Sequence, residues 1–347
     1  MNDKKFSLTV MAMFAILTLA VVTFNYWMDP LWNFSHAHEY NDVQLVTDER
    51  EQKTANQIYV PKTADTLLLG SSRSTYIHHD GFTDWKVYNY SVANLSMREY
   101  YTMMDFAFEQ NPDYERVILG VDFFKSSTKE AEAPRSIQNH VKRVTQPFYR
   151  AKNLLSFDLM KTSMENLQMS ADDEITEDRL YNREGDAFAR ELSEEETLSD
   201  TNAKIEKFES TFYGESYVYY PKYKEIMAKV RDLHPEAEKI VYTTPISSEL
   251  FKSLVSTGLF EEYEVWLRDL IDVYGGVWNF MYPNTVTNDI TNYYDGHHFY
   301  PEVGYFISSR MEQGDNADAP EDFGIYVTPE NIDAHLQQVK KLADELE

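Results

Sequence analysis

The chain has 347 residues, 43% hydrophobic and 14% aromatic, so it can bury a substantial core and is not a disordered chain. Its formal charge of −26, with no basic cluster, argues against binding nucleic acid or an anionic membrane surface through a basic patch. It contains no cysteine, which excludes disulfides and cysteine lipidation.

An uncharged stretch, residues 6–28, is long enough to cross a bilayer of about 30 Å as a helix. Lys4 and Lys5 precede it, and aromatic residues at its end suit the membrane surface. The positive-inside rule then places the rest of the chain outside the cytoplasm. We predict an uncleaved signal-anchor over 1–28, single-pass in the cell membrane. A cleaved signal peptide is the alternative, although the stretch is long for one and no clear cleavage site follows.

Residues 29–63 are predicted to link this anchor to an α/β domain spanning 64–312. The predicted strands have buried apolar runs or alternating patterns and are Thr66–Leu69, Trp85–Val92, Arg116–Val121, Ile240–Thr243 and Gly276–Phe280. The predicted helices between them are Ser96–Gln110, Pro221–Leu233 and Phe251–Tyr274. Strands alternating with helices imply right-handed crossovers. We therefore expect a flavodoxin-like three-layer α/β/α fold with a parallel five-stranded sheet.

Two further segments flank or interrupt this pattern. Residues 125–215 are acidic, show a helical pattern and contain no convincing buried strand, so we interpret them as a helical insertion beside the site that adds no strand to the sheet. Residues 313–347 comprise a polar linker and an amphipathic helix with Ile332, Leu336 and Val339 on one stripe. We expect this helix to dock on the domain. Binding of a partner is the alternative.

Two polar motifs carry the candidate chemistry. Gly70-Ser71-Ser72-Arg73-Ser74 directly follows the first strand, and Asp295-Gly296-His297-His298 lies near the C-terminus. A serine at the start of a helix, at the carboxyl edge of a sheet, can attack a carbonyl while an imidazole removes its proton and free N–H groups face the oxyanion. Helix capping alone is the other explanation of Ser72, and Ser71 suits either role.

The order and spacing of these motifs resemble the SGNH (GDSL-like) hydrolase superfamily. There a Gly-x-Ser block follows the first strand and an Asp-x-x-His block precedes the last helix. The Gly-Ser-Ser form is similar to the membrane-anchored branch that includes the D-alanyl-lipoteichoic-acid protein DltD and the polysaccharide O-acetyltransferases. The resemblance covers roughly residues 62–312. It implies Ser72 as nucleophile, His298 as general base and Asp295 as the group orienting the imidazole. It also suggests an integral membrane acyl-transfer partner.

The expected oxyanion site departs from that family. Common members offer a glycine N–H from a second block and an asparagine side chain from a third. Here the second block runs from Asn89 through Ser91 to Asn94, and the third ends at Asp122. An ionised Asp122 would repel an oxyanion. Ser91, Asn94 and Arg73 are therefore the alternative oxyanion or substrate-binding residues.

No cofactor and no metal ion are predicted. His36 and His38, and likewise His78, His79 and Asp80, lack the further spaced ligands that a closed metal site needs. Three hypotheses for function follow. The first is an acyltransferase that moves an acyl or acetyl group onto cell-surface or secreted polysaccharide through a serine ester. The second is a carbohydrate esterase with the same triad. The third is a non-catalytic glycan-binding or assembly protein, which the aspartate in the third block favours.

Overall fold

The computed structural model describes residues 3–61, 63–131, 137–172 and 175–346. The chain is α/β and divides into two compact units. The smaller unit comprises Met1–Pro61 with Gln138–Gly185, and the larger comprises Lys62–Ile137 with Asp186–Glu347. The stretch 125–215, predicted as one insertion, therefore contributes to both units.

The larger unit is built on a mixed six-stranded sheet with the order β3-β2-β4-β7-β8-β9. The strands are β2 Thr66–Leu69, β3 Val87–Asn89, β4 Arg116–Val121, β7 Glu238–Thr243, β8 Val277–Asn279 and β9 Ile325–Val327. The first five in this order pair in parallel, whereas β9 pairs antiparallel with β8. The prediction of a purely parallel sheet of five strands is thus corrected. The edge strand β9 has three residues, only one of them buried, and its Ile325–Val327 run is too short to predict a strand from sequence alone.

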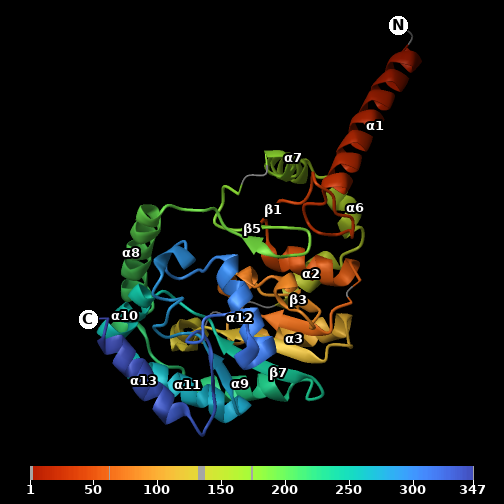
Figure 1. Ribbon diagram of the computed structural model, residues 1–347. Coiled ribbons are helices and arrows are strands. Elements are labelled where there is room, and N and C mark those ends of the chain that lie inside the picture. Colours follow the sequence, from red (N-terminus) through yellow and green to blue (C-terminus); the bar gives the residue numbers. More distant parts are fainter. Residues whose placement is uncertain (1–2, 62, 132–136, 173–174, 347) are drawn as a thin grey trace. The chain divides into compact units, whose positions relative to one another are not determined.

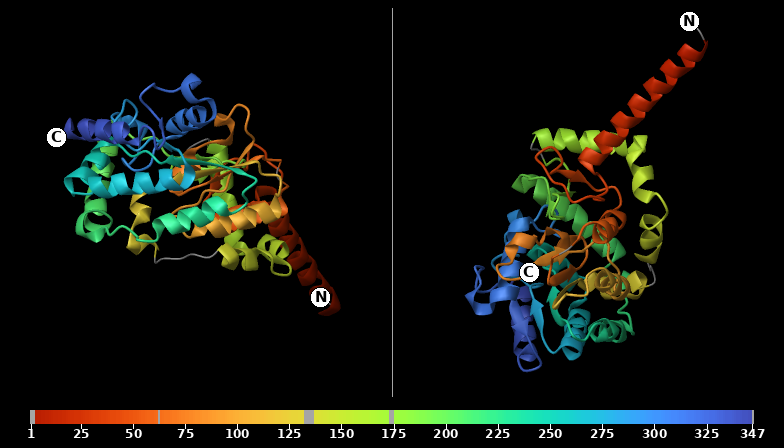
Figure 2. Two further views of the ribbon diagram at one scale, coloured as in Figure 1. Left: turned by 90° about the horizontal axis from the view of Figure 1, so that it is seen from below. Right: turned by 90° about the vertical axis from the view of Figure 1, so that its right-hand side faces the viewer.

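Helices cover both faces of this sheet, and Figure 2 (left) shows α3, α9 and α11 on one side and α12 on the other. The helices after each strand are α3 Glu99–Gln110, α9 Tyr223–Asp232, α10 Ser248–Ser256, α11 Phe260–Tyr274 and α12 Pro301–Gln313. The segment predicted as one helix from Phe251 to Tyr274 is two helices. Gly258, with φ of +83°, lies between them, because its left-handed backbone ends the first helix.

The C-terminal helix α13, Ile332–Asp344, packs within the larger unit as expected. Its buried side chains are Ile332, Leu336 and Val339, which are the residues named in the predicted stripe, together with Ala343. Docking of this stripe on the domain is therefore the outcome, and the stripe leaves no broad apolar face for another partner.

The stretch 125–215 is mainly helical. Its described elements are α4 Thr128–Ala131, α5 Ile137–Val144, α6 Tyr149–Leu154, α7 Phe157–Asp172, β5 Leu180–Tyr181, β6 Ala187–Phe188 and α8 Glu194–Thr211. None of the described residues here joins the six-stranded sheet. The stretch does contain two strands, each two residues long, which the sequence analysis did not expect. Strands this short are defined by their partners and have no periodicity of their own.

The smaller unit begins with α1, Asp3–Met28, drawn in red in Figure 1. This helix is long and apolar enough to span a membrane. The segment predicted as a linker contains β1, Gln44–Leu45, which pairs antiparallel with β5, and α2, Glu49–Tyr59. Asp48 caps α2 by accepting a hydrogen bond from the backbone N–H of Glu51.

Candidate active site

Ser72 follows β2 at the carboxyl edge of the sheet, where the chain enters a 3₁₀ turn, Ser72–Tyr76. The chain passes so close to itself that a Cβ on Gly70 would lie 2.0 Å from Ser74 Oγ, so glycine is required. The helix expected to start at this serine is a five-residue 3₁₀ turn. Ser71 is buried with 2% of its surface exposed, whereas Ser72 is partly exposed. The turn therefore presents Ser72 and buries Ser71.

Ser72, His298 and Asp295 form a continuous hydrogen-bonded chain. Ser72 Oγ is 2.9 Å from His298 Nε2, and His298 Nδ1 is 2.9 Å from Asp295 Oδ2 and 3.1 Å from Oδ1. A neutral imidazole with its proton on Nδ1 donates to the carboxylate and leaves Nε2 to accept the Ser72 hydroxyl. This is the arrangement of a serine nucleophile, its base and the group that orients the base.

The loop itself fixes the carboxylate of Asp295. Asp295 Oδ1 accepts the backbone N–H groups of His297 at 3.0 Å and His298 at 2.7 Å. Gly296 has φ of +67°, and a Cβ there would lie 2.6 Å from Thr201 Cγ2. Burial opposes ionisation of Asp295, but the charge and hydrogen bond of His298, followed by those of Lys204, outweigh it and hold the pKa of Asp295 well below its usual range. The orienting group is therefore a carboxylate.

The neighbouring histidine is not suited to act as the base. His297 is buried against the rings of Phe124 and Phe208. Burial, followed by the nearby charge of Arg73, lowers the pKa of His297 well below its ordinary value. His297 is thus a neutral packing residue, and the aspartate spacing selects His298, as the sequence predicted.

A lysine that the sequence analysis missed completes the site. Lys204, on α8, places Nζ 2.5 Å from Asp295 Oδ2, and its side chain is 21% exposed. Lys204 and His298 therefore share one carboxylate oxygen. Lys204 lies in a helix far from the Asp295 loop in the chain, and no local pattern distinguishes it from Lys207, the other lysine of that helix.

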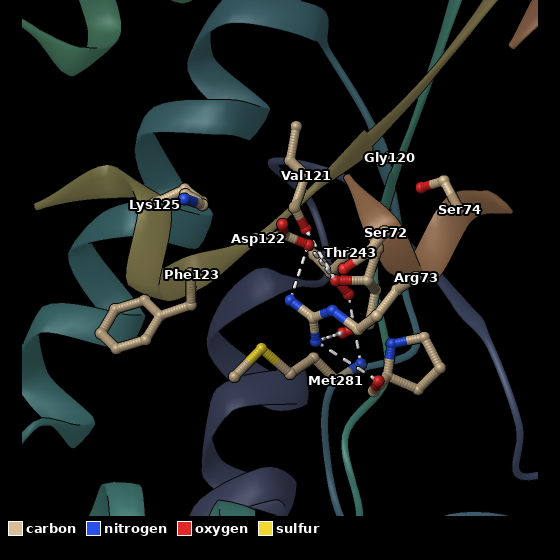
Figure 3. A network of polar contacts seen from close by, with 12 residues as sticks. Ser72, Arg73, Ser74, Gly120, Val121, Asp122, Phe123, Lys125, Thr243 and Met281 are labelled. Atoms are coloured by element: carbon tan, nitrogen blue, oxygen red, sulfur yellow. Dashed lines mark hydrogen bonds and ion pairs between the residues drawn. The ribbon is translucent and has the colours of Figure 1, made fainter. Parts of the chain in front are cut away.

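Arg73 and Asp122 form a buried ion pair behind Ser72 (Figure 3). Arg73 Nη2 donates to Asp122 Oδ1 at 2.6 Å, and both side chains are 1% exposed. Arg73 Nη1 donates to the carbonyls of Thr244 at 3.2 Å and Pro245 at 3.4 Å, and the Thr244 hydroxyl donates to Asp122 at 2.6 Å. Asp122 thus does not present an unpaired charge, and Arg73 is committed to tying β2, β4 and β7 together. Neither residue is placed as the oxyanion or substrate contact that the sequence analysis considered.

Ser91 and Asn94 have polar contacts with residues outside the triad. Ser91 is buried, and its backbone N–H donates to Asn89 Oδ1 at 3.0 Å. Asn94 is exposed, has φ of +56° and accepts a hydrogen bond from Lys125 Nζ. The backbone N–H of Ser72 stands at the first position of its turn, where an N–H group has no acceptor within the turn, so it is a candidate oxyanion donor.

The histidines considered as metal ligands have other partners. His78 Nε2 is 2.8 Å from the carbonyl of Ala187, and His79 Nδ1 is 2.7 Å from Asp186 Oδ2. His36 and His38 both direct Nε2 to the carbonyl of Trp27. Within the described residues, no group of three His, Asp or Glu side chains could hold a metal ion.

No protein-family model matches the chain, and no curated protein matches it significantly. The likeness to the SGNH superfamily therefore remains a resemblance carried by two motifs, to which the structure adds the contact between them.

Proposed function

We propose that the chain is a membrane-anchored serine acyltransferase that moves an acyl or acetyl group onto a cell-envelope polysaccharide. The observation that carries the proposal is the Ser72–His298–Asp295 chain, with both hydrogen-bond distances at 2.9 Å. The order of the five parallel strands, which is that of flavodoxin-like sheets, supports it, because Ser72 then lies at the edge where such sheets bind ligands. Lys4 and Lys5, in the first turn of α1, favour placing both units outside the cytoplasm.

The chemistry follows from the contacts. His298 Nε2 takes the proton of Ser72 Oγ as that oxygen forms a bond to the acyl carbonyl carbon, and the N–H of Ser72 faces the developing oxyanion. Collapse breaks the bond to the leaving oxygen, which takes the proton from His298. An acceptor hydroxyl then loses its proton to His298 and attacks the Ser72 ester, which regenerates the serine. Asp295 holds the Nδ1 proton throughout and stabilises the imidazolium.

The same contacts support the esterase alternative, in which water instead of a sugar hydroxyl resolves the Ser72 ester. The pairing of Asp122 with Arg73 weakens the main argument for a non-catalytic protein, since the aspartate charge is compensated. Transfer and hydrolysis are distinguished by the fate of the acyl group when a polysaccharide acceptor is added.

The test is covalent labelling of the full chain in detergent with a fluorophosphonate probe, followed by mass spectrometry of the adduct. We expect one adduct on Ser72, absent in Ser72→Ala. An unlabelled wild-type chain, in a preparation with native helix content, would refute the catalytic proposal. If the wild-type chain is labelled, a fresh portion that has not been exposed to the probe is given a radioactive acetyl donor with and without soluble polysaccharide. Radioactivity recovered on the polysaccharide supports acyl transfer, and radioactivity recovered only as free acetate supports hydrolysis.

A further inference from the structure

Helix α7 in the smaller unit buries two polar side chains and exposes two large apolar ones. Its buried positions are Ser163 and Asn166, both polar, whereas Phe157 is 70% exposed and Met164 57% exposed. Leu155, in the turn before α7, is 50% exposed. In a helix that faces water, the apolar side chains turn inward and the polar ones outward. The outward face of α7 therefore combines large apolar side chains with the exposed Lys161 and Gln168, a mixture suited to the boundary between lipid and water.

The buried polar face of α7 is held by specific hydrogen bonds. Asn166 Oδ1 accepts the N–H of Leu45 at 3.0 Å, and Asn166 Nδ2 donates to Gln44 Oε1 at 2.8 Å. Ser170 Oγ accepts the N–H of Val43 at 3.0 Å. These bonds to β1 and its approach fix the rotation of the helix about its axis, so Phe157 and Met164 are kept on the outside.

Hydrogen bonds also fix α7 at the end of α1. Asn25, a buried polar residue of α1, donates to the carbonyls of Leu154 at 3.1 Å and Ser156 at 2.9 Å, and Ser163 Oγ donates to Asn25 Oδ1 at 3.1 Å. In Figures 1 and 2 (right), α7 lies across the lower end of α1 and runs transverse to it.

The length of α1 determines the depth at which α7 would lie relative to the membrane. At about 1.5 Å per residue, about 20 residues cross a hydrocarbon layer of about 30 Å. Counted from the start of the uncharged stretch at Phe6, that brings Asn25 to the outer boundary, and Tyr26 and Trp27, which are 47% and 37% exposed, to the headgroup level. Because Asn25 binds the turn before α7, α7 lies at this same boundary.

We propose that α7 lies in the plane of the membrane interface, with Leu155, Phe157 and Met164 inserted between the lipid headgroups and the ends of the acyl chains. The occupant of this apolar face is lipid, because the face continues directly from the membrane-exposed surface of α1. Lys161, whose side chain is 80% exposed on the same face, can extend its charge to the headgroups. This proposal rests on the membrane placement of α1 within the proposed function, and not on the acyl chemistry.

The absence of native cysteine permits a direct test with single-cysteine variants of the full chain. Phe157→Cys and Met164→Cys are labelled with an environment-sensitive fluorophore and reconstituted into phosphatidylcholine and phosphatidylglycerol nanodiscs with or without nitroxide-labelled lipid. Val218→Cys, at a site 61% exposed in the larger unit, is the matched control, and Leu17→Cys in the middle of α1 reports the anchor.

We expect nitroxide in the upper acyl chain to quench the labels at positions 157 and 164 at least twofold and to leave position 218 nearly unchanged. Water-like emission without quenching at both 157 and 164, with position 17 quenched, would overturn the placement of α7 alone. Blue-shifted but unquenched emission would mean that protein, either a second copy or a partner, covers this face, and would also overturn it. If the label at position 17 is not quenched, the placement of α1 in the membrane is refuted. Fluorophosphonate labelling of Ser72 tests the acyl chemistry separately.

Discussion

Replacing Lys204 with methionine is the sharpest test of how the site controls its base. Lys204 Nζ and His298 Nδ1 contact the same oxygen of Asp295, at 2.5 and 2.9 Å, so the two nitrogens are at most about 5.4 Å apart. With an effective dielectric constant of about 20, two positive charges at that distance repel by about 3 kcal/mol. Lys204 therefore disfavours the imidazolium form of His298 and keeps the base neutral to lower pH.

Activity through Ser72 requires neutral His298, so its rate falls as pH decreases through the titration of that imidazole. About 3 kcal/mol corresponds to about 2 pH units, and partial solvent screening of Lys204 reduces this to between about 1 and 2 units. We expect the acid limb of the labelling rate with a fluorophosphonate probe to move upward by that amount in Lys204→Met. The assay is the second-order labelling rate of the full chain between pH 4 and 9, at constant ionic strength.

Two matched variants control this experiment. Lys204→Arg keeps the charge and should leave the acid limb within about 0.5 unit of wild type. Lys207→Met removes an exposed lysine from the same helix and should have no effect. An acid limb unchanged in Lys204→Met, or moved equally in Lys204→Arg, would refute the electrostatic role of Lys204 and leave it only a structural one.

Three further outcomes are expected. Ser72→Ala and His298→Ala should each abolish nearly all acyl turnover, and combining the two substitutions should reduce the turnover little further. Ser71→Ala should keep most of the turnover. A covalent adduct that still forms in Ser72→Ala would identify a different nucleophile. Arg73→Met should lower the free energy of unfolding by about 3–5 kcal/mol, because it leaves the buried carboxylate of Asp122 unpaired; denaturant unfolding measures this, and a loss below about 1 kcal/mol would contradict a desolvated pair. Protease added to intact spheroplasts should digest both units and leave a fragment containing α1, whereas protection of the whole chain would refute the outward orientation.

Local sequence was sufficient for the parts of the fold and site whose physical cause is local. β2 was predicted with its observed bounds because a four-residue apolar run buried on both faces has no other stable position in an α/β sheet. The Asp295 and His298 contact was predictable because the two residues are only three positions apart in the chain, and the loop closes through Gly296. The length and composition of α1 are likewise properties of a single segment.

Only tertiary structure decided the features that depend on partners distant in sequence. β9 became a strand because β8 offers it an open edge, although its own three residues show no burial pattern. Asp122 was expected to oppose catalysis, but its pairing with Arg73 across the sheet compensates its charge, and the sequence does not specify that contact. Lys204 reaches Asp295 only because α8 packs beside the last loop. Charges act over a few ångströms in space whatever their separation along the chain, so the sequence suggested the residues of the candidate triad, whereas the fold determined the electrostatic environment around them.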